Sequence, residues 1–302
     1  MTCSSIAEAT AQGRSKSVRK ATRMLACLPV VMMASAVCAQ DCSVTPSTIR
    51  VGEVMRLRCS SRAATASMNG RTVRLFSQPE GDRLGLMPVA VSDTAGVYAI
   101  EFLADDGEVI QSAVATARET RFPTESLLLD PAIAELRSSP DEIQLLAAFR
   151  ESVTDMRYWE DPFVAPVPGC FTSPFGVKRV RNGKPTGDYH RGVDQRSPTG
   201  YPVRAVAAGV IKIAQQFTAL GGTVGLDHGQ GLETMYLHMS SLLALPSAHV
   251  NRGDVIGYVG STGRSNGPHL HWAIYVNGVP VNPSQWVTLR PCSASASRVR
   301  RR

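Results

Sequence analysis

The chain has 302 residues and a mass of 32.4 kDa, which is enough for about two domains. Hydrophobic residues make up 43% and charged residues 19%, so neither a wholly disordered chain nor a fibrous repeat fits. The formal net charge of +7 arises at the two ends, in residues 1–39 and 298–302. The segment between them is nearly neutral, and we therefore expect no basic face for nucleic acid.

Residues 1–39 have the pattern of a secretory signal. Basic residues precede an apolar stretch, Met24 to Val37, which ends in the small-residue site Val37-Cys38-Ala39. The stretch is shorter than the ~20 residues of a membrane-spanning helix, although an uncleaved anchor is the alternative. We expect cleavage after Ala39 and export to the periplasm or cell envelope.

Four cysteines remain after the signal, and an even number is typical of disulfide bonds in an oxidising compartment. They are Cys42, Cys59, Cys170 and Cys292. Three pairings are open, and the sequence does not choose among them. We favour Cys42–Cys59 and Cys170–Cys292, because each then lies within one domain. None of the four belongs to a C-x-x-C pair, so we expect no cysteine zinc site.

Residues 40–118 are predicted to form a small β-sandwich-like module. Short apolar runs alternate there with turn signals such as Met68-Asn69-Gly70 and Asp105-Asp106-Gly107. The module contains no histidine and no cluster of carboxylates, so we expect a spacer or docking role.

Residues 119–165 are predicted to form a helical connector. Ser139-Pro140-Asp141-Glu142 is a helix start, with an N-cap serine, a proline in the first turn and a glutamate that closes a capping box. Apolar residues then recur at steps of three and four and predict a packed face: Ile143, Leu146, Phe149, Val153 and Met156.

Residues 166–290 are predicted to form an antiparallel β domain, followed by a basic tail over 291–302. Glycine punctuates a series of short apolar runs with no convincing helix between them. The expected strands cover 201–206, 209–213, 222–226, 255–259 and 269–276. The whole chain is therefore expected to be mainly β.

Every histidine of the chain lies in this last domain, and three short segments can combine into a metal site. His269 and His271 share one face of a strand, because alternate residues point the same way. His190 and Asp194 are also an even number of residues apart and can converge. Two imidazoles and a carboxylate make a three-ligand zinc set that leaves a position for water. His238 supplies a further imidazole for proton transfer.

Other readings of these residues are weaker. A lone histidine is usually a surface or core residue, and we interpret His228 and His249 in that way. The glycine-rich loop 260–267 resembles a phosphate-binding loop, but it lacks Gly-Lys-Ser/Thr and precedes a strand. The strand pattern also resembles the β domains of sugar-phosphotransfer carriers, in which a histidine carries phosphate, but those proteins need neither a signal peptide nor Asp194.

These residues resemble the lysostaphin-type (LytM-domain) zinc metallopeptidases over about residues 170–284. The motifs that carry the resemblance are Thr172-Ser173-Pro174-Phe175-Gly176, His190-Arg191-Gly192-Val193-Asp194, Asp227-His228-Gly229-Gln230-Gly231, Thr234-Met235-Tyr236-Leu237-His238 and Gly267-Pro268-His269-Leu270-His271-Trp272. The resemblance implies one Zn²⁺ held by His190, Asp194 and His271. It implies His238 and His269 as the catalytic acid/base or oxyanion-stabilising histidines, without dividing the two roles between them.

The resemblance also implies an endopeptidase that hydrolyses peptide cross-links or stem peptides of bacterial peptidoglycan. The alternative from another class is a catalytically inert relative that binds peptidoglycan or activates an amidase. Arg179 and Arg191 flank the site in sequence and are candidates for holding substrate carboxylates, against a simple solvated role. A regulatory envelope protein is a further candidate partner, and the sequence does not indicate an oligomeric state.

Overall fold

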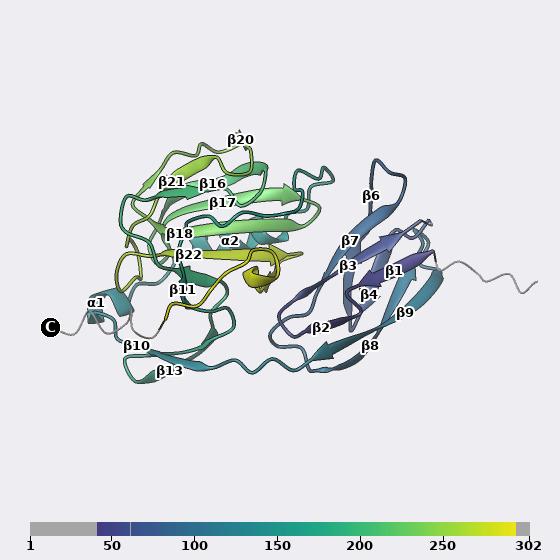
Figure 1. The fold of residues 1–302 in the computed structure, drawn as a ribbon, viewed down its shortest axis with the longest axis horizontal. Helices are drawn as coiled ribbons and strands as arrows, with labels where there is room; N and C mark the ends of the chain where they lie inside the picture. The colour runs from purple at the N-terminus through teal and green to yellow at the C-terminus, as the bar shows by residue number, and fades with distance from the viewer. Residues whose placement is uncertain (1–40, 61, 294–302) are drawn as a thin grey trace, which may run out of the picture. The chain divides into compact units, whose positions relative to one another are not determined.

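The computed structural model describes residues 41–60 and 62–293. It is mainly β, which confirms the predicted fold class (Figure 1). The expected signal segment and the arginines at the C-terminal end lie outside the described residues. Within the ranges described, no helix has the length and apolar character needed to cross a membrane.

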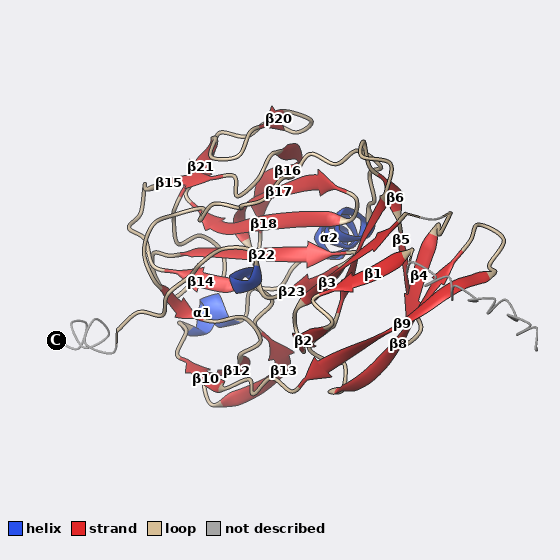
Figure 2. Ribbon diagram, turned by 45° about the vertical axis from the view of Figure 1, so that its right-hand side comes forward, coloured by secondary structure: helices blue, strands red, loops and turns tan. Residues whose placement is uncertain are grey.

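The N-terminal module consists of two facing sheets (Figure 2). One has the order β1 (Cys42–Thr45), β3 (Val54–Cys59), β7 (Arg83–Pro88), β6 (Phe76–Ser77). The other has the order β2 (Thr48–Arg50), β9 (Val109–Arg118), β8 (Gly96–Leu103), β4 (Thr65–Met68), β5 (Arg71–Arg74). Alternate side chains of both sheets fill the core between them, including Leu57, Met87, Ile100 and Phe102. The predicted disulfide Cys42–Cys59 is present and joins β1 to β3.

The connector contains the predicted helix, but that helix is shorter than its apolar pattern. Helix α2 (Pro140–Glu151) begins with the full capping box of Ser139 and Glu142. It ends before Val153 and Met156, which are 39% and 60% exposed. Ile143, inside the helix, is 56% exposed. The expectation that Ile143, Val153 and Met156 belong to the packed face is therefore wrong, and Leu146 and Phe149 form it. Beyond Glu151 the backbone bonds to the β-sheet instead, because Thr154 O accepts the N–H of Gln230 and Tyr158 N–H donates to His228 O.

The connector also contributes a short helix, α1 (Pro131–Ala134), and a strand that the sequence did not indicate. Strand β10 (Thr124–Leu127) pairs in parallel with β12 (Lys178–Arg181), and β13 (Lys184–Tyr189) completes this three-stranded sheet. The β10 sequence carries no run of apolar residues, so its strand state depends on backbone pairing with β12. This pairing places the connector beside the histidine-rich domain.

The histidine-rich domain is built on an eight-stranded sheet with the order β11 (Phe171–Ser173), β14 (Val193–Gln195), β22 (Leu270–Val276), β18 (Leu232–Met239), β17 (Gly221–Gly229), β16 (Gly209–Phe217), β20 (His249–Val250), and with β23 (Val279–Val281) paired to β22. A smaller sheet has the order β15 (Pro202–Arg204), β21 (Val255–Tyr258), β19 (Ser241–Leu242). A 3₁₀ turn covers Pro283–Gln285. Thus the five segments predicted as strands are strands.

Both faces of the large sheet are covered. One face buries Tyr236 and Trp272 in the main core of the domain. The opposite face packs against Leu146 and Phe149 of α2. The second predicted disulfide, Cys170–Cys292, is also present, and it ties the start of the domain to its end. The sheet is consequently a rigid support for the side chains at its end near β14 and β22.

His228 lies in this core with no exposed surface, as expected for a structural histidine. Its Nδ1 donates to Ala208 O over 2.7 Å, and its Nε2 lies 2.8 Å from the Thr234 hydroxyl. Burial lowers the pKa of His228 to about 4. The neutral ring is therefore the form that the fold stabilises. Because the unfolded pKa is higher, near 6.5, this stability is present above pH 6.5 and is lost as the pH falls toward about 4.

We expect a His228→Asn variant to lose part of the protein's sensitivity to acid. Between pH 7 and 4.5 the titration of His228 should cost about 2–3 kcal/mol of the free energy of unfolding. Urea unfolding at both pH values, compared between the wild type and the variant, measures this term. The exposed His249, changed to Asn, is the control and should keep the wild-type pH dependence. An equal acid loss in wild type and His228→Asn would contradict the prediction.

Candidate metal centre

Three side chains from separate segments meet at one point of the sheet. The ligand atoms of His190, Asp194 and His271 all lie within 4.8 Å of one another. Asp194 Oδ1 is 3.0 Å from His190 Nε2 and 2.9 Å from His271 Nδ1. The two imidazole nitrogens are 2.9 Å apart. Among the residues that the structure describes, this is the one group of three or more such side chains able to hold a metal ion.

The pairing of β14 with β22 creates this convergence. Asp194 lies directly opposite His271 in the antiparallel register, so both side chains leave the same face of the sheet. The adjacent Gly192 allows the close approach. A Cβ atom at that position would lie 2.2 Å from Trp272 O and 2.9 Å from His271 Nε2. We infer that glycine in the motif is a steric requirement of the site.

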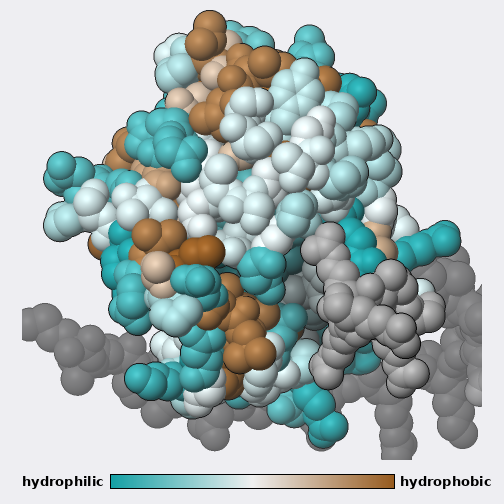
Figure 3. Space-filling view, turned by 90° about the vertical axis from the view of Figure 1, so that its left-hand side faces the viewer, coloured by the Kyte–Doolittle hydropathy of each residue, from teal (hydrophilic) through white to brown (hydrophobic). Residues whose placement is uncertain are grey.

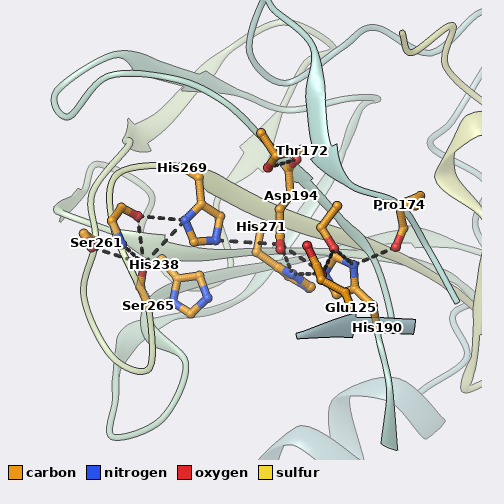
Figure 4. Close-up of polar contacts among 12 residues, drawn as sticks. Glu125, Thr172, Pro174, His190, Asp194, His238, Ser261, Ser265, His269 and His271 are labelled. Carbon is orange, nitrogen blue, oxygen red and sulfur yellow. Dashed lines mark hydrogen bonds and ion pairs between the residues drawn. The ribbon is translucent and has the colours of Figure 1, made fainter. Parts of the chain in front are cut away.

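His190 is oriented by the loop that follows β11. Its Nδ1 lies 2.8 Å from the carbonyl oxygen of Pro174, and since a carbonyl only accepts, Nδ1 carries the hydrogen. The lone pair of Nε2 therefore faces Asp194 Oδ1. Two acceptors so close together are stabilised by a cation between them. Figure 4 shows this hydrogen bond and the position of Pro174 behind the ring.

His238 and His269 lie beside this cluster and are oriented in the same way (Figure 4). His238 Nδ1 donates to Thr262 O, and His269 Nδ1 donates to Gly267 O, each over 2.8 Å. Both rings thus keep a lone pair on Nε2. His269 Nε2 is 3.7 Å from Asp194 Oδ1, and the ring centroids of His238 and His269 are 5.1 Å apart. The structure therefore brings together all five side chains predicted for the site.

The backbone at His238 is unusual. Its φ is +63°, in the left-handed region that non-glycine residues seldom adopt. Its N–H leaves the regular ladder and donates to Leu220 O. This conformation, which lies near the end of β18, directs the ring toward His269 instead of along the strand. Such strain at a buried histidine is characteristic of functional positions.

Burial sets the charge states of the cluster. It lowers the pKa of His271 to about 4 and that of His238 to about 3, and neighbouring histidines add to the effect. Burial alone would raise the pKa of Asp194, but the charges and hydrogen bonds of His190 and His271 hold it well below its usual value. Near neutral pH His271 is thus a neutral imidazole and Asp194 a carboxylate, which are the protonation states that metal binding requires.

These atoms fit a zinc ion. Ligands of tetrahedral zinc at ~2.0–2.1 Å from the metal are about 3.3 Å from each other. The observed separations of 2.9 to 3.0 Å are close to that value. Nitrogen and carboxylate ligands, three in number, leave the fourth position open, as in catalytic rather than structural zinc sites.

Arg179, a predicted substrate contact, is instead held by the site's own carboxylates. Its side chain is 12% exposed, and Nη2 donates to Asp194 Oδ2 over 2.9 Å. The same guanidinium lies 3.6 Å from Glu125, and Ser173 Oγ donates to Glu125 over 2.7 Å. Arg191 lies at the surface, with 47% of its side chain exposed and Asp188 at 3.4 Å. Of the two arginines, Arg191 is the one whose guanidinium can reach a ligand from solvent.

Glu125 and Ser173 are part of the site although the sequence did not single them out as functional. Ser173 Oγ contacts Glu125 Oε2 and lies 3.3 Å from His190 Nδ1. Ser173 stands in the quoted Thr172–Gly176 motif, which was the available signal. Glu125 had no such signal, because it belongs to β10 in the connector.

A cleft of about 1060 Å³ opens over the cluster. His190, His238, His269 and His271 line it, together with Met235 and Tyr275. Figure 3 shows one face of this domain, where apolar patches at the β20–β21 end and at the β10 end are separated by a band of weakly polar side chains. The buried histidines therefore face a space large enough for a peptide segment.

Comparison with protein families matches residues 188–283 to Peptidase family M23. This range contains the whole five-residue cluster. Residues 188–283 are a Peptidase M23 domain. The resemblance stated from the sequence is thereby confirmed for this part of the chain.

Relatives with known names are similar over about a third of the chain. The DD-carboxypeptidase/endopeptidase Mpg of Neisseria meningitidis is 46% identical over 112 residues, which are 37% of this chain and 26% of that protein. The peptidoglycan DD-endopeptidase ShyA of Vibrio cholerae is 41% identical over 93 residues, which are 31% of this chain and 22% of that protein. The chain thus spans about a quarter of the length of these relatives.

A solved structure extends the similarity beyond the M23 domain. A crystal structure of an M23 peptidase from Pseudomonas aeruginosa superposes with a TM-score of 0.55 and 27% identity. The superposition covers 74% of this chain and 86% of that one. An arrangement with β structure outside the M23 domain is therefore present in another member of the family.

We expect an Arg179→Met variant to bind zinc about 10- to 100-fold more weakly than the wild type. The substitution removes the donor to Asp194 Oδ2 and leaves that buried carboxylate less well oriented. Competition with a chromophoric chelator measures the affinity. Arg191→Met, which removes a more exposed guanidinium from the same cleft, is the matched control and should bind zinc as the wild type does. Equal affinities of Arg179→Met and wild type would show that Arg179 does not support the site.

Proposed function

We propose that the protein is a zinc-dependent endopeptidase that hydrolyses peptide cross-links or stem peptides of bacterial peptidoglycan. The observation that carries the proposal is the convergence of His190, Asp194 and His271 in the cleft, with His238 and His269 beside them. The peptidoglycan endopeptidase activity named for relatives of the M23 domain supports the choice of substrate. The same proposal includes export to the periplasm or cell envelope. It also includes domain boundaries at residues 118 and 165, on either side of the connector.

His190, Asp194 and His271 would hold the metal. When bound, Zn²⁺ lowers the pKa of a coordinated water to about 7 and polarises the peptide carbonyl. The Nε2 atoms of His238 and His269 would then serve in proton transfer and in hydrogen bonding to the substrate. One of them accepts the proton of the attacking water, and the other donates a hydrogen bond to the oxyanion of the tetrahedral intermediate. Since both rings carry hydrogen on Nδ1, Nε2 of either ring can accept the proton of the water, and the ring that donates to the oxyanion does so as an imidazolium with a second hydrogen on Nε2.

The surrounding residues maintain these orientations. The carbonyls of Thr262 and Gly267 fix the two rings, so neither histidine can present Nδ1 to a substrate. Arg179 donates to Asp194, and Glu125 accepts a hydrogen bond from Ser173. The protein part of the site is thus preorganised, which reduces the reorganisation needed in the transition state.

Digestion of defined peptidoglycans tests the proposal. Purified protein would be incubated with one peptidoglycan that has direct diaminopimelate cross-links and with one that has glycine bridges, with and without chelator. We expect peptide fragments by mass spectrometry from at least one of them, their loss with chelator, and their return on adding zinc. A protein that binds one zinc ion and the polymer but releases no fragment would instead be the inert peptidoglycan-binding relative.

A further inference from the structure

Two guanidinium groups in the cleft lack a carboxylate partner of the kind that Arg179 and Arg191 have. Arg181 is the last residue of β12, and Arg264 lies in the loop between β21 and β22. Both line the cleft that contains the metal centre. We call them the arginine pair.

The donors of the arginine pair are largely unused. Arg264 Nη1 donates to Leu136 O over 3.0 Å, which leaves its other N–H groups without a protein acceptor among the described residues. Over the same residues, Arg181 has neither a side-chain hydrogen bond nor a carboxylate within 4.0 Å. Arg179, by contrast, is paired with Asp194, and Arg191 lies near Asp188.

The pair is also electrostatically unfavourable in the free protein. Burial, together with the nearby charges of Arg181 and Arg137, lowers the pKa of Arg264 to about 10, and the charge of Asp188 opposes this in part. Burial also lowers the pKa of Arg181; the charge of Asp188 opposes the shift, and the charges of Arg179 and Arg137 add to it. Of the described residues that line the cleft, six are arginines and three are acidic. Half-buried, mutually repelling cations with free donors are stabilised when an anion binds between them.

The elements that carry the pair also carry the site. The loop of Arg264 includes Thr262, whose carbonyl orients His238, and it continues to His269. Arg264 N–H donates to Ala219 O over 2.8 Å, so the loop is held in place by the end of β16–β17. Arg181 follows Arg179 on the same face of β12. An anion bound by the pair therefore has a fixed position relative to the metal centre.

We propose that Arg181 and Arg264 bind a free carboxylate of the peptide substrate and thereby select acidic stem peptides over amidated or neutral ones. This inference rests on the proposed function. Guanidinium groups bind carboxylates through paired N–H donors, whereas a carboxamide brings no charge to offset their repulsion. Stem peptides of peptidoglycan carry free carboxylates, and glycine bridges carry none. The pair thus favours a cross-link flanked by acidic residues over a glycine bridge.

A matched pair of synthetic substrates tests the proposal. One is a cross-linked dimer of stem peptides with free glutamate and diaminopimelate carboxylates, and the other has those groups as carboxamides. The zinc-loaded protein should cleave the acid form with a kcat/KM about 10- to 100-fold higher, the range of a charge-assisted hydrogen bond. Arg181→Gln and Arg264→Gln should each lower kcat/KM for the acid form and change that for the amide form by less than about 3-fold. The double variant should show no preference.

Arg204→Gln is the control, because Arg204 is exposed on β15 and lies outside the cleft; it should keep the full preference. Arg264→Lys should recover part of the preference, since it keeps the charge without the planar donors. An equal loss on both substrates would mean that the arginines support the structure only, and an unchanged preference in the double variant would overturn the carboxylate site.

Calorimetry with the zinc-free protein separates this inference from the proposed function. The acid peptide should bind more tightly than the amide peptide, and the double variant should bind both equally. If the wild type cleaves neither peptide, the proposed function fails. The difference in affinity between the acid and the amide peptide still tests whether the arginine pair binds a carboxylate. Equal binding of both peptides by the wild type would reject it.

Discussion

A His271→Ala variant should fold but lose its zinc and its hydrolytic activity. His271 supplies one of three ligand atoms from the paired strands β14 and β22. Zinc affinities of about 10–16 kcal/mol, divided evenly over three or four ligands, correspond to about 2.5–5 kcal/mol for each ligand. The zinc dissociation constant should therefore increase by more than about 100-fold. Since burial keeps the His271 ring neutral, removing it creates no unpaired charge at neutral pH.

Metal analysis of the dialysed protein measures the zinc content, and thermal unfolding in the presence of chelator checks that the variant is folded. His249→Ala is the control, because His249 is exposed on β20 and should retain one zinc ion per chain. Retention of stoichiometric zinc by His271→Ala, with unchanged affinity, would remove the metal centre from the proposal.

A His238→Ala variant should keep its zinc and lose most of its turnover. His238 is not among the three grouped ligand residues, but its Nε2 is held toward the cleft by the bond from Nδ1 to Thr262 O. General acid–base groups contribute about 10²- to 10⁴-fold to a rate. We expect kcat to fall by that factor, KM to change little, and zinc content to stay at one ion per chain. His269→Ala should behave in the same way, because its ring has the same orientation.

Steady-state kinetics on a cross-linked peptide, together with metal analysis of each variant, provide the test. A variant that loses zinc and activity together would indicate a structural role. Wild-type kcat in both His238→Ala and His269→Ala would mean that neither ring takes part in proton transfer.

Most of the fold could be predicted from local patterns. Turn residues and apolar runs located several strands in each of the two β regions, and the capping box located the start of α2. The end of α2 was not predictable, because Val153 and Met156 continue a helical spacing by chance. The chain there is not helical, and Thr154 and Tyr158 bond to the end of β17 and the turn that follows it. A pattern within a segment does not reveal hydrogen bonds to a strand about 70 residues away.

The predicted site residues meet as alternation along strands suggested. The residues that surround them could not be predicted from the sequence, because they come from distant segments of the chain. The register that sets Asp194 opposite His271 depends on pairing between strands that are distant in the sequence. The contribution of Glu125 also comes from pairing, because β10 places it opposite Arg179 of β12, and Arg179 in turn bonds to Asp194 of β14. The site residues within the motifs were therefore identified from the sequence, whereas Glu125, which lies outside them, was not.

Strand β10 has a practical meaning for dissecting the protein. A fragment that begins between β10 and β11 would omit Glu125 and leave Ser173 and Arg179 without that carboxylate neighbour. It would also expose the edge of β12 that β10 occupies, a surface prone to association with other chains. A fragment designed to contain the complete site should consequently begin upstream of Thr124, so that it includes β10.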